Sequence, residues 1–153
     1  MVTTINGFTE KEVVNLYRFL CIYESELGKI GNQEAFEKKF SKLKDLEKLM
    51  SSLTCNYCSR ESLNIVGIVP MNNLVSMTKC RTSKILSLLH HLRNSIAHAQ
   101  IEQEKGYVSL IDYGYEKDKK SKTEKKVFSA RGKIKTKTLF EMILIIMDNI
   151  KSI

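Results

Sequence analysis

Hydrophobic residues recur at helical spacing in the first third of the chain. Thr9 and Glu12 have the spacing of a capping box, in which each side chain satisfies a free amide at the start of a helix. A second apolar stripe predicts a helix over residues 33–53. The first helix is predicted to end near Gly28 and Gly31, after a stripe made of Val13, Leu16, Tyr17, Leu20, Tyr23 and Leu27.

The middle of the chain is less regular. A short helix is expected around residues 60–66, and another helical stretch over residues 72–79. Thr82 or Ser83 then caps a stronger helix. Its buried stripe consists of Ile85, Leu88, Leu89, Leu92 and Ile96.

After this helix the hydrophobic period changes from 3.6 to 2. Residues 107–113 alternate like a half-exposed strand, and residues 126–130 are its expected partner. A hairpin over about 107–130 is therefore predicted, with the lysine-rich residues 116–126 at its tip.

The last helix is predicted to begin after Thr138, which forms a second capping box with Glu141, and to reach about Lys151. It is apolar on nearly all sides, which is typical of a helix buried in a core or in a subunit interface.

These elements predict one mainly α domain over residues 1–153. The expected architecture is an up-and-down bundle of four to five helices, with the β-hairpin inserted before the last helix. The N-terminus lacks the order of a secretory signal, and the longest purely apolar run, Met142–Met147, is far too short for a membrane helix. Four scattered cysteines do not form a disulfide scaffold. We therefore expect a soluble, cytoplasmic protein with no membrane partner.

The net charge of +8 is confined to one segment. Residues 117–137 carry ten Lys or Arg side chains against two acids, and the remaining 132 residues are formally neutral. A basic patch of this kind attracts the nucleic-acid backbone without regard to sequence, although it is also compatible with a solvated hairpin tip. The expected RNA-binding residues are Lys117, Lys119, Lys120, Lys122, Lys125 and Lys126.

The segment from Leu89 to His98 holds the most informative polar residues. Arg93 lies five residues before His98, with Asn94 and Ser95 between them. A histidine can exchange a proton near neutral pH, and an arginine can hold a phosphate through paired hydrogen bonds. Because RNA supplies its own nucleophile, the 2′-hydroxyl, such residues can cleave a phosphodiester with no metal ion or other cofactor.

In its context this motif resembles the HEPN superfamily, whose mark is an arginine, a polar residue and then a histidine on a late helix of a small bundle. The matching positions are Arg93, Asn94 and His98, and the likeness covers roughly the last half of the chain. Stand-alone plasmid and defence proteins are the nearest in kind. The resemblance implies a helical bundle that dimerises around the motif helix. It also implies a metal-independent endoribonuclease, used as a toxin or antiviral effector, with Asn94 and Ser95 as supporting catalytic residues.

The spacing also constrains the geometry. On a regular helix five residues turn about 500°, so Arg93 and His98 point about 140° apart. Either the helix opens near Ser95, or a two-fold dimer brings Arg93 of one subunit close to His98 of the other. We favour the dimer, because the apolar C-terminal helix needs more cover than one small bundle offers.

Simpler interpretations stand beside these. His98 can balance the dipole at a helix end, Arg93 can form an ordinary ion pair, and His90 and His91 are typical of solvated helix positions. The Cys55–Cys58 pair has the spacing of zinc ligands, but no second pair exists, so reduced cysteines and no metal are expected.

Three hypotheses for function follow. The first is a homodimeric HEPN ribonuclease. The second is a non-catalytic HEPN module that binds RNA or an antitoxin partner. The third and weakest is a helical DNA-binding regulator, which lacks a helix with a basic recognition face.

Overall fold

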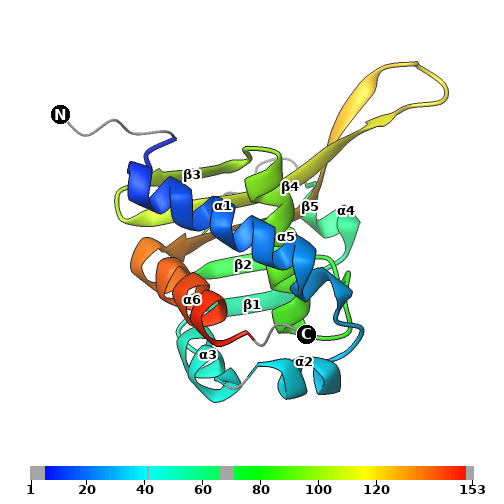
Figure 1. The fold of residues 1–153 in the computed structure, drawn as a ribbon. Coiled ribbons are helices and arrows are strands. Elements are labelled where there is room, and N and C mark those ends of the chain that lie inside the picture. The colour runs from blue at the N-terminus through cyan, green and yellow to red at the C-terminus, as the bar shows by residue number, and fades with distance from the viewer. Residues whose placement is uncertain (1–5, 41, 66–70, 151–153) are drawn as a thin grey trace.

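A five-stranded mixed sheet forms the centre of the molecule (Figure 1). The computed structural model describes residues 6–40, 42–65 and 71–150. The strand order is β1-β2-β5-β4-β3, in which only β1 and β2 run parallel to each other. The strands are β1 (Thr54–Tyr57), β2 (Leu74–Met77), β3 (Ile101–Glu104), β4 (Tyr107–Lys117) and β5 (Glu124–Lys135).

Helices cover one face of this sheet. The helix α5 contacts β4, β2 and β1, and α6 contacts β5 and β4, while α1 packs against both helices as an outer layer (Figure 1). The helices are α1 (Glu10–Ser25), the 3-10 turn η1 (Leu27–Lys29), α2 (Gln33–Lys39), α3 (Leu43–Met50), α4 (Arg60–Leu63), α5 (Lys84–Ala97) and α6 (Thr136–Asn149).

Alternation along β4 sets the buried face. Val108, Leu110 and Asp112 are buried, whereas the residues between them are half-buried. The register between β4 and β5 shifts between Asp112 and Tyr113, so Ser129 of β5 has no paired residue on β4. The outcome is that a carboxylate, Asp112, points from the sheet into the layer that α5 occupies.

The predicted mainly α bundle is wrong, because the described residues form a mixed α/β fold around the sheet. The segment 72–79, expected to be helical, contains β2, which is held between β1 and β5. The strands β1 and β3 were not predicted either. Four-residue strands are too short to display a period. The partners of β1 and β2 are distant in sequence, so pairing decides their structure, whereas β3 pairs with the next strand, β4, across the two-residue turn of Lys105 and Gly106.

The predicted helix over residues 33–53 is also wrong in its extent. It is two helices, α2 and α3, because Phe40 adopts extended backbone and forms a β-bridge with Ile150. The helix expected around residues 60–66 is the single turn α4, and residues 66–70 lie outside the described part of the chain.

Other predictions are confirmed. The capping box of α1 is present, with Thr9 N–H donating to Glu12 Oε1 (2.9 Å) and Glu12 N–H donating to Thr9 Oγ1 (3.2 Å). Ser83 caps α5. The hairpin is present and longer than expected, and beyond Tyr113 it projects from the body as a two-stranded ribbon (Figure 1).

The start of the last helix differs from its prediction. The helix α6 begins at Thr136, with Lys135 as a cap that makes no side-chain hydrogen bond. Thr138 and Glu141 therefore lie inside the helix and form no capping box. The buried residues of α6 are Leu139, Met142, Ile143 and Ile146, whereas Leu144 is exposed. Within the described ranges, no helix has the length and apolar character needed to cross a membrane.

The pairing of β2 with β5 yields a first prediction. A Cβ on Gly132 would lie 2.4 Å from the Leu74 carbonyl oxygen and 2.6 Å from Val75 Cα, so a side chain cannot be added without moving β2. Gly132→Ala should lower the free energy of unfolding by about 1–3 kcal/mol in urea titrations. The control is Gly114→Ala in the ribbon, where a Cβ meets nothing within 4 Å. Equal midpoints for the two variants would contradict this account of the sheet.

Candidate functional site

The predicted motif residues lie on α5, which remains a regular helix to Ala97. Its N-terminus is fixed by Ser83, whose Oγ accepts a hydrogen bond from Leu86 N–H. His98 is the exposed C-cap residue of this helix. Because the helix does not open near Ser95, Arg93 and His98 of one protomer leave it in directions about 140° apart. One chain therefore does not bring these two side chains together.

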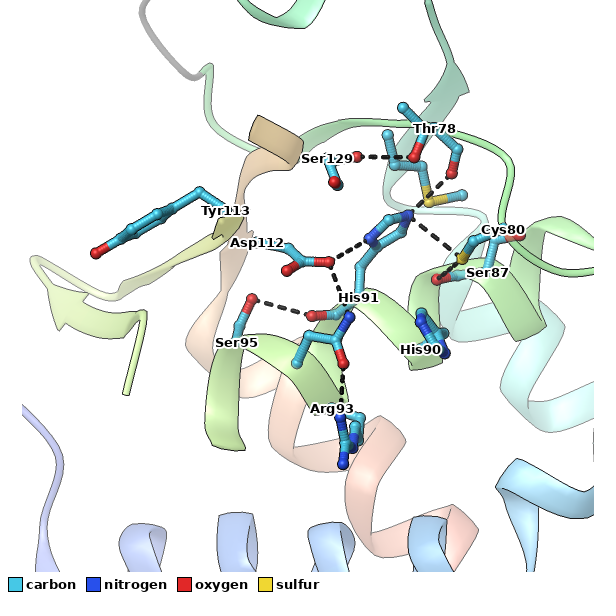
Figure 2. A network of polar contacts seen from close by, with 12 residues as sticks. Thr78, Cys80, Ser87, His90, His91, Arg93, Ser95, Asp112, Tyr113 and Ser129 are labelled. Atoms are coloured by element: carbon cyan, nitrogen blue, oxygen red, sulfur yellow. Dashed lines mark hydrogen bonds and ion pairs between the residues drawn. The ribbon is translucent and has the colours of Figure 1, made fainter. Parts of the chain in front are cut away.

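Arg93 and Asn94 are brought together, in a chain of polar contacts (Figure 2). Arg93 Nε donates to Glu24 Oε1 on α1 (2.5 Å), and Arg93 Nη1 donates to Asn94 Oδ1 (2.8 Å). Asn94 Nδ2 in turn donates to Asp112 Oδ2 (3.1 Å). The arginine is half-buried and is oriented by both neighbours, in keeping with the ion-pair interpretation.

Ser95 has a different place. It is fully buried, and its Oγ lies 3.0 Å from the His91 carbonyl oxygen and 3.0 Å from the Ile111 carbonyl oxygen. These contacts attach α5 to β4. Ser95 therefore positions the helix and does not line a surface that a substrate could reach.

Next to these contacts lies a buried ion pair (Figure 2). His91 Nδ1 is 2.7 Å from Asp112 Oδ2, and His91 Nε2 donates to the Thr78 carbonyl oxygen (2.9 Å). Burial opposes the charge on His91, but hydrogen bonds to Asp112, Cys80 and the Thr78 carbonyl raise its pKa to about 10. Burial likewise opposes ionisation of Asp112, but hydrogen bonds from His91 and Asn94 hold its pKa below the usual range.

A pocket of about 540 Å³ opens between the end of α1, η1 and the middle of α5. Arg81 Nη1 donates to Tyr23 Oη (2.8 Å), and Tyr23 Oη lies 3.1 Å from His90 Nδ1. Arg81 Nη2 also donates to the Ile30 carbonyl oxygen. The pocket is lined by Tyr23, Glu24, Gly28, Lys29, Ile30, Gly31, Arg81, His90 and Arg93.

The electrostatics of this pocket favour an anion. Three cationic side chains, Lys29, Arg81 and Arg93, face one carboxylate, Glu24. Burial and the nearby charges of His91 and Arg81 lower the pKa of His90, so the ring is neutral at pH 7 and able to accept a proton. A neutral imidazole beside two guanidinium groups is an arrangement suited to a phosphate ester.

Sequence reasoning missed most of this pocket. His90 precedes Arg93 by three residues, a spacing that puts both on one helix face, and this was the available signal. Tyr23 and Arg81 carry no comparable signal, because they reach the pocket from segments that are distant in sequence.

The lysine-rich part of the basic segment, residues 117–126, lies on the projecting ribbon and its turn (Figure 1), whereas Arg131, Lys133 and Lys135 lie in the part of β5 within the sheet and Lys137 lies in α6. All six predicted RNA-binding lysines are exposed on the ribbon or its turn. Lys126 Nζ sits 3.9 Å from the centre of the Tyr113 ring, which is a cation–π contact, and Tyr115 is 63% exposed. The ribbon thus offers charge and aromatic surface together.

The described residues contain no group of three or more His, Cys, Asp or Glu side chains arranged to hold a metal ion. Cys55 and Cys58 are free thiols, and burial raises the pKa of Cys55 to about 11. Comparison of the chain with protein-family models, curated proteins and solved structures finds no match.

The buried pair predicts a pH-dependent stability. The unfolded chain loses the His91 proton near pH 6.5, whereas folded His91 keeps it to about pH 10, so this contribution is complete below pH 6.5 and declines as the pH rises to 10. Over that range the free energy of unfolding of the wild type should fall more steeply than that of His91→Gln, by up to about 1.4 kcal/mol per pH unit. Urea midpoints at a series of pH values measure the difference. Parallel profiles would show that His91 is not held charged.

Proposed function

We propose that the protein binds RNA and cleaves it without a metal ion, at the pocket between α1 and α5. The observation that carries the proposal is that Arg81, Arg93 and a neutral His90 line one open pocket. The resemblance of the Arg93 motif to HEPN ribonucleases supports the same chemistry. It is also the only support for a role as a toxin or antiviral defence effector.

In this proposal the two arginines hold the scissile phosphate and stabilise the charge that builds on its oxygens. His90 takes the proton of the 2′-hydroxyl as that oxygen attacks phosphorus. This requires the tautomer in which Nδ1–H donates to Tyr23 Oη, so that Nε2 is free to accept. Tyr23 Oη can accept this bond and the bond from Arg81, because it has two lone pairs.

The expected products are a 2′,3′-cyclic phosphate and a free 5′-hydroxyl, whose oxygen takes up a proton from solvent. Glu24 competes with the phosphate for Arg93, so substrate must displace it. The ribbon lysines are proposed to gather the RNA backbone, and exposed Tyr115 to stack on an unpaired base.

His98 can act in cleavage at this pocket only if it comes from a second copy of the chain. A homodimer in which His98 of the partner subunit reaches the Arg93 pocket is the alternative source of the proton acceptor.

A non-catalytic module that binds RNA or an antitoxin is the second candidate. Arg93 is already bonded to Glu24 and Asn94, and this favours it, since an arginine engaged in this way stabilises the fold without any substrate.

Cleavage of structured and unstructured RNA in EDTA tests the proposal. Arg93→Ala and His90→Ala should each lower the rate by about 100-fold or more, because each removes a group that acts in the transition state. The matched control is Arg18→Ala on the exposed side of α1, which should cleave like the wild type. Glu24→Gln should tighten RNA binding.

Each other result has a defined meaning. RNA binding without cleavage by the wild type would support the non-catalytic module. Loss of activity in His98→Ala, with His90→Ala active and a dimer on a sizing column, would move the catalytic histidine to the partner subunit. Neither binding nor cleavage would contradict both candidates.

The ribbon is tested by replacing Lys119, Lys120, Lys122 and Lys125 with Gln. RNA affinity should fall, and the slope of log Kd against log salt should decrease by about 0.7 for each phosphate that a lysine no longer neutralises, while kcat is unchanged. The control replaces the same number of exposed lysines on α1 and around α3: Lys11, Lys42, Lys44 and Lys48. Equal effects of the two sets would mean that net charge, not the ribbon, attracts RNA.

A further inference from the structure

Cys80 combines exposure with an uncommon polar environment (Figure 2). Its Sγ lies 3.5 Å from His91 Nε2 and 3.8 Å from the Ser87 carbonyl oxygen. Its neighbours in sequence, Lys79 and Arg81, are both cationic. The sulfur belongs to a surface hollow of about 550 Å³, lined by Gly31, Lys79, Cys80, Arg81 and Thr82.

The protons on His91 follow from its partners. Nδ1 faces the Asp112 carboxylate and Nε2 faces the Thr78 carbonyl oxygen, and both of these groups accept hydrogen bonds only. Both ring nitrogens must therefore carry a proton. The Nε2–H that points at Thr78 also lies within reach of the sulfur, so Cys80 has a fixed cationic proton donor beside it.

This order of groups, sulfur, imidazole and carboxylate, is that of an activated thiol nucleophile. The groups around the sulfur decide which electrophile fits. Acyl transfer needs amide donors for an oxyanion, but the Arg81 N–H beside the sulfur already donates to Ser87 Oγ (3.0 Å). A peroxide needs only a thiolate, a nearby proton donor and access from solvent.

We propose that Cys80 is a site of oxidation by hydrogen peroxide, with His91 as the proton donor. The Cys80 thiol, which donates to the Ser87 carbonyl oxygen (3.8 Å), first loses its proton to solvent. The thiolate sulfur then attacks one peroxide oxygen, so that the S–O bond forms as the O–O bond breaks. The sulfur loses two electrons and the peroxide gains them. The departing hydroxide takes the Nε2 proton of His91 and leaves as water, and Cys80 becomes a sulfenic acid. His91 then regains a proton from solvent.

Cys21 supplies an internal control, because it is also an exposed free thiol. The reduced full chain is treated with hydrogen peroxide at pH 7, sulfenic acids are trapped with dimedone, and each cysteine is followed by mass spectrometry. Cys80 should be labelled at least about tenfold faster than Cys21. Equal rates at the two cysteines would overturn the proposal, and this comparison needs no variant.

His91→Gln tests the proton donor. The variant should lower the Cys80 rate about tenfold and leave the Cys21 rate unchanged. If the variant unfolds, both rates will move together, and the comparison within the wild type decides the matter. A folded variant with an unchanged Cys80 rate would remove His91 from the mechanism.

Discussion

The ion pair between His91 and Asp112 is the interaction on which the arrangement of both sites depends. It joins the middle of α5 to the buried face of β4, and among the described residues these two are the only charged side chains that are buried. Two charges taken out of water are costly unless their remaining hydrogen-bonding positions are filled. Here the Thr78 carbonyl and Asn94 fill them, so the register of α5 against the sheet is fixed by polar chemistry as well as by packing.

Each end of this pair serves a different surface. Through Asn94, the Asp112 carboxylate orients Arg93 toward the pocket below α1. At the other end of the pair, the Nε2–H of His91 faces Cys80, which lies just before the start of α5. A single buried contact therefore connects the guanidinium group of one site with the sulfur of another, and neither surface can be repacked without disturbing the other.

The sequence revealed the parts of the fold that are locally determined. Thr9 and Glu12 form their capping box from local contacts alone, so the start of α1 does not depend on tertiary packing. The apolar stripe of α5 and the alternation of β4 extend over enough residues to show their period. The break at Phe40 and the short strand β2 depend on partners far along the chain, and local patterns do not contain them. The candidate site follows the same division: the spacing along the chain indicates Arg93 and Asn94, whereas only folding brings Tyr23 to His90, Arg81 to Tyr23 and Cys80 to His91.

The ribbon formed by the ends of β4 and β5 has a separate consequence. Beyond Tyr113 its backbone pairs only with itself, and its tip contributes no side chain to the core. Its length and charge can therefore change with little effect on the free energy of folding. Insertions or charge changes in this arm would therefore leave α5, its buried charges and the sheet beneath them in place.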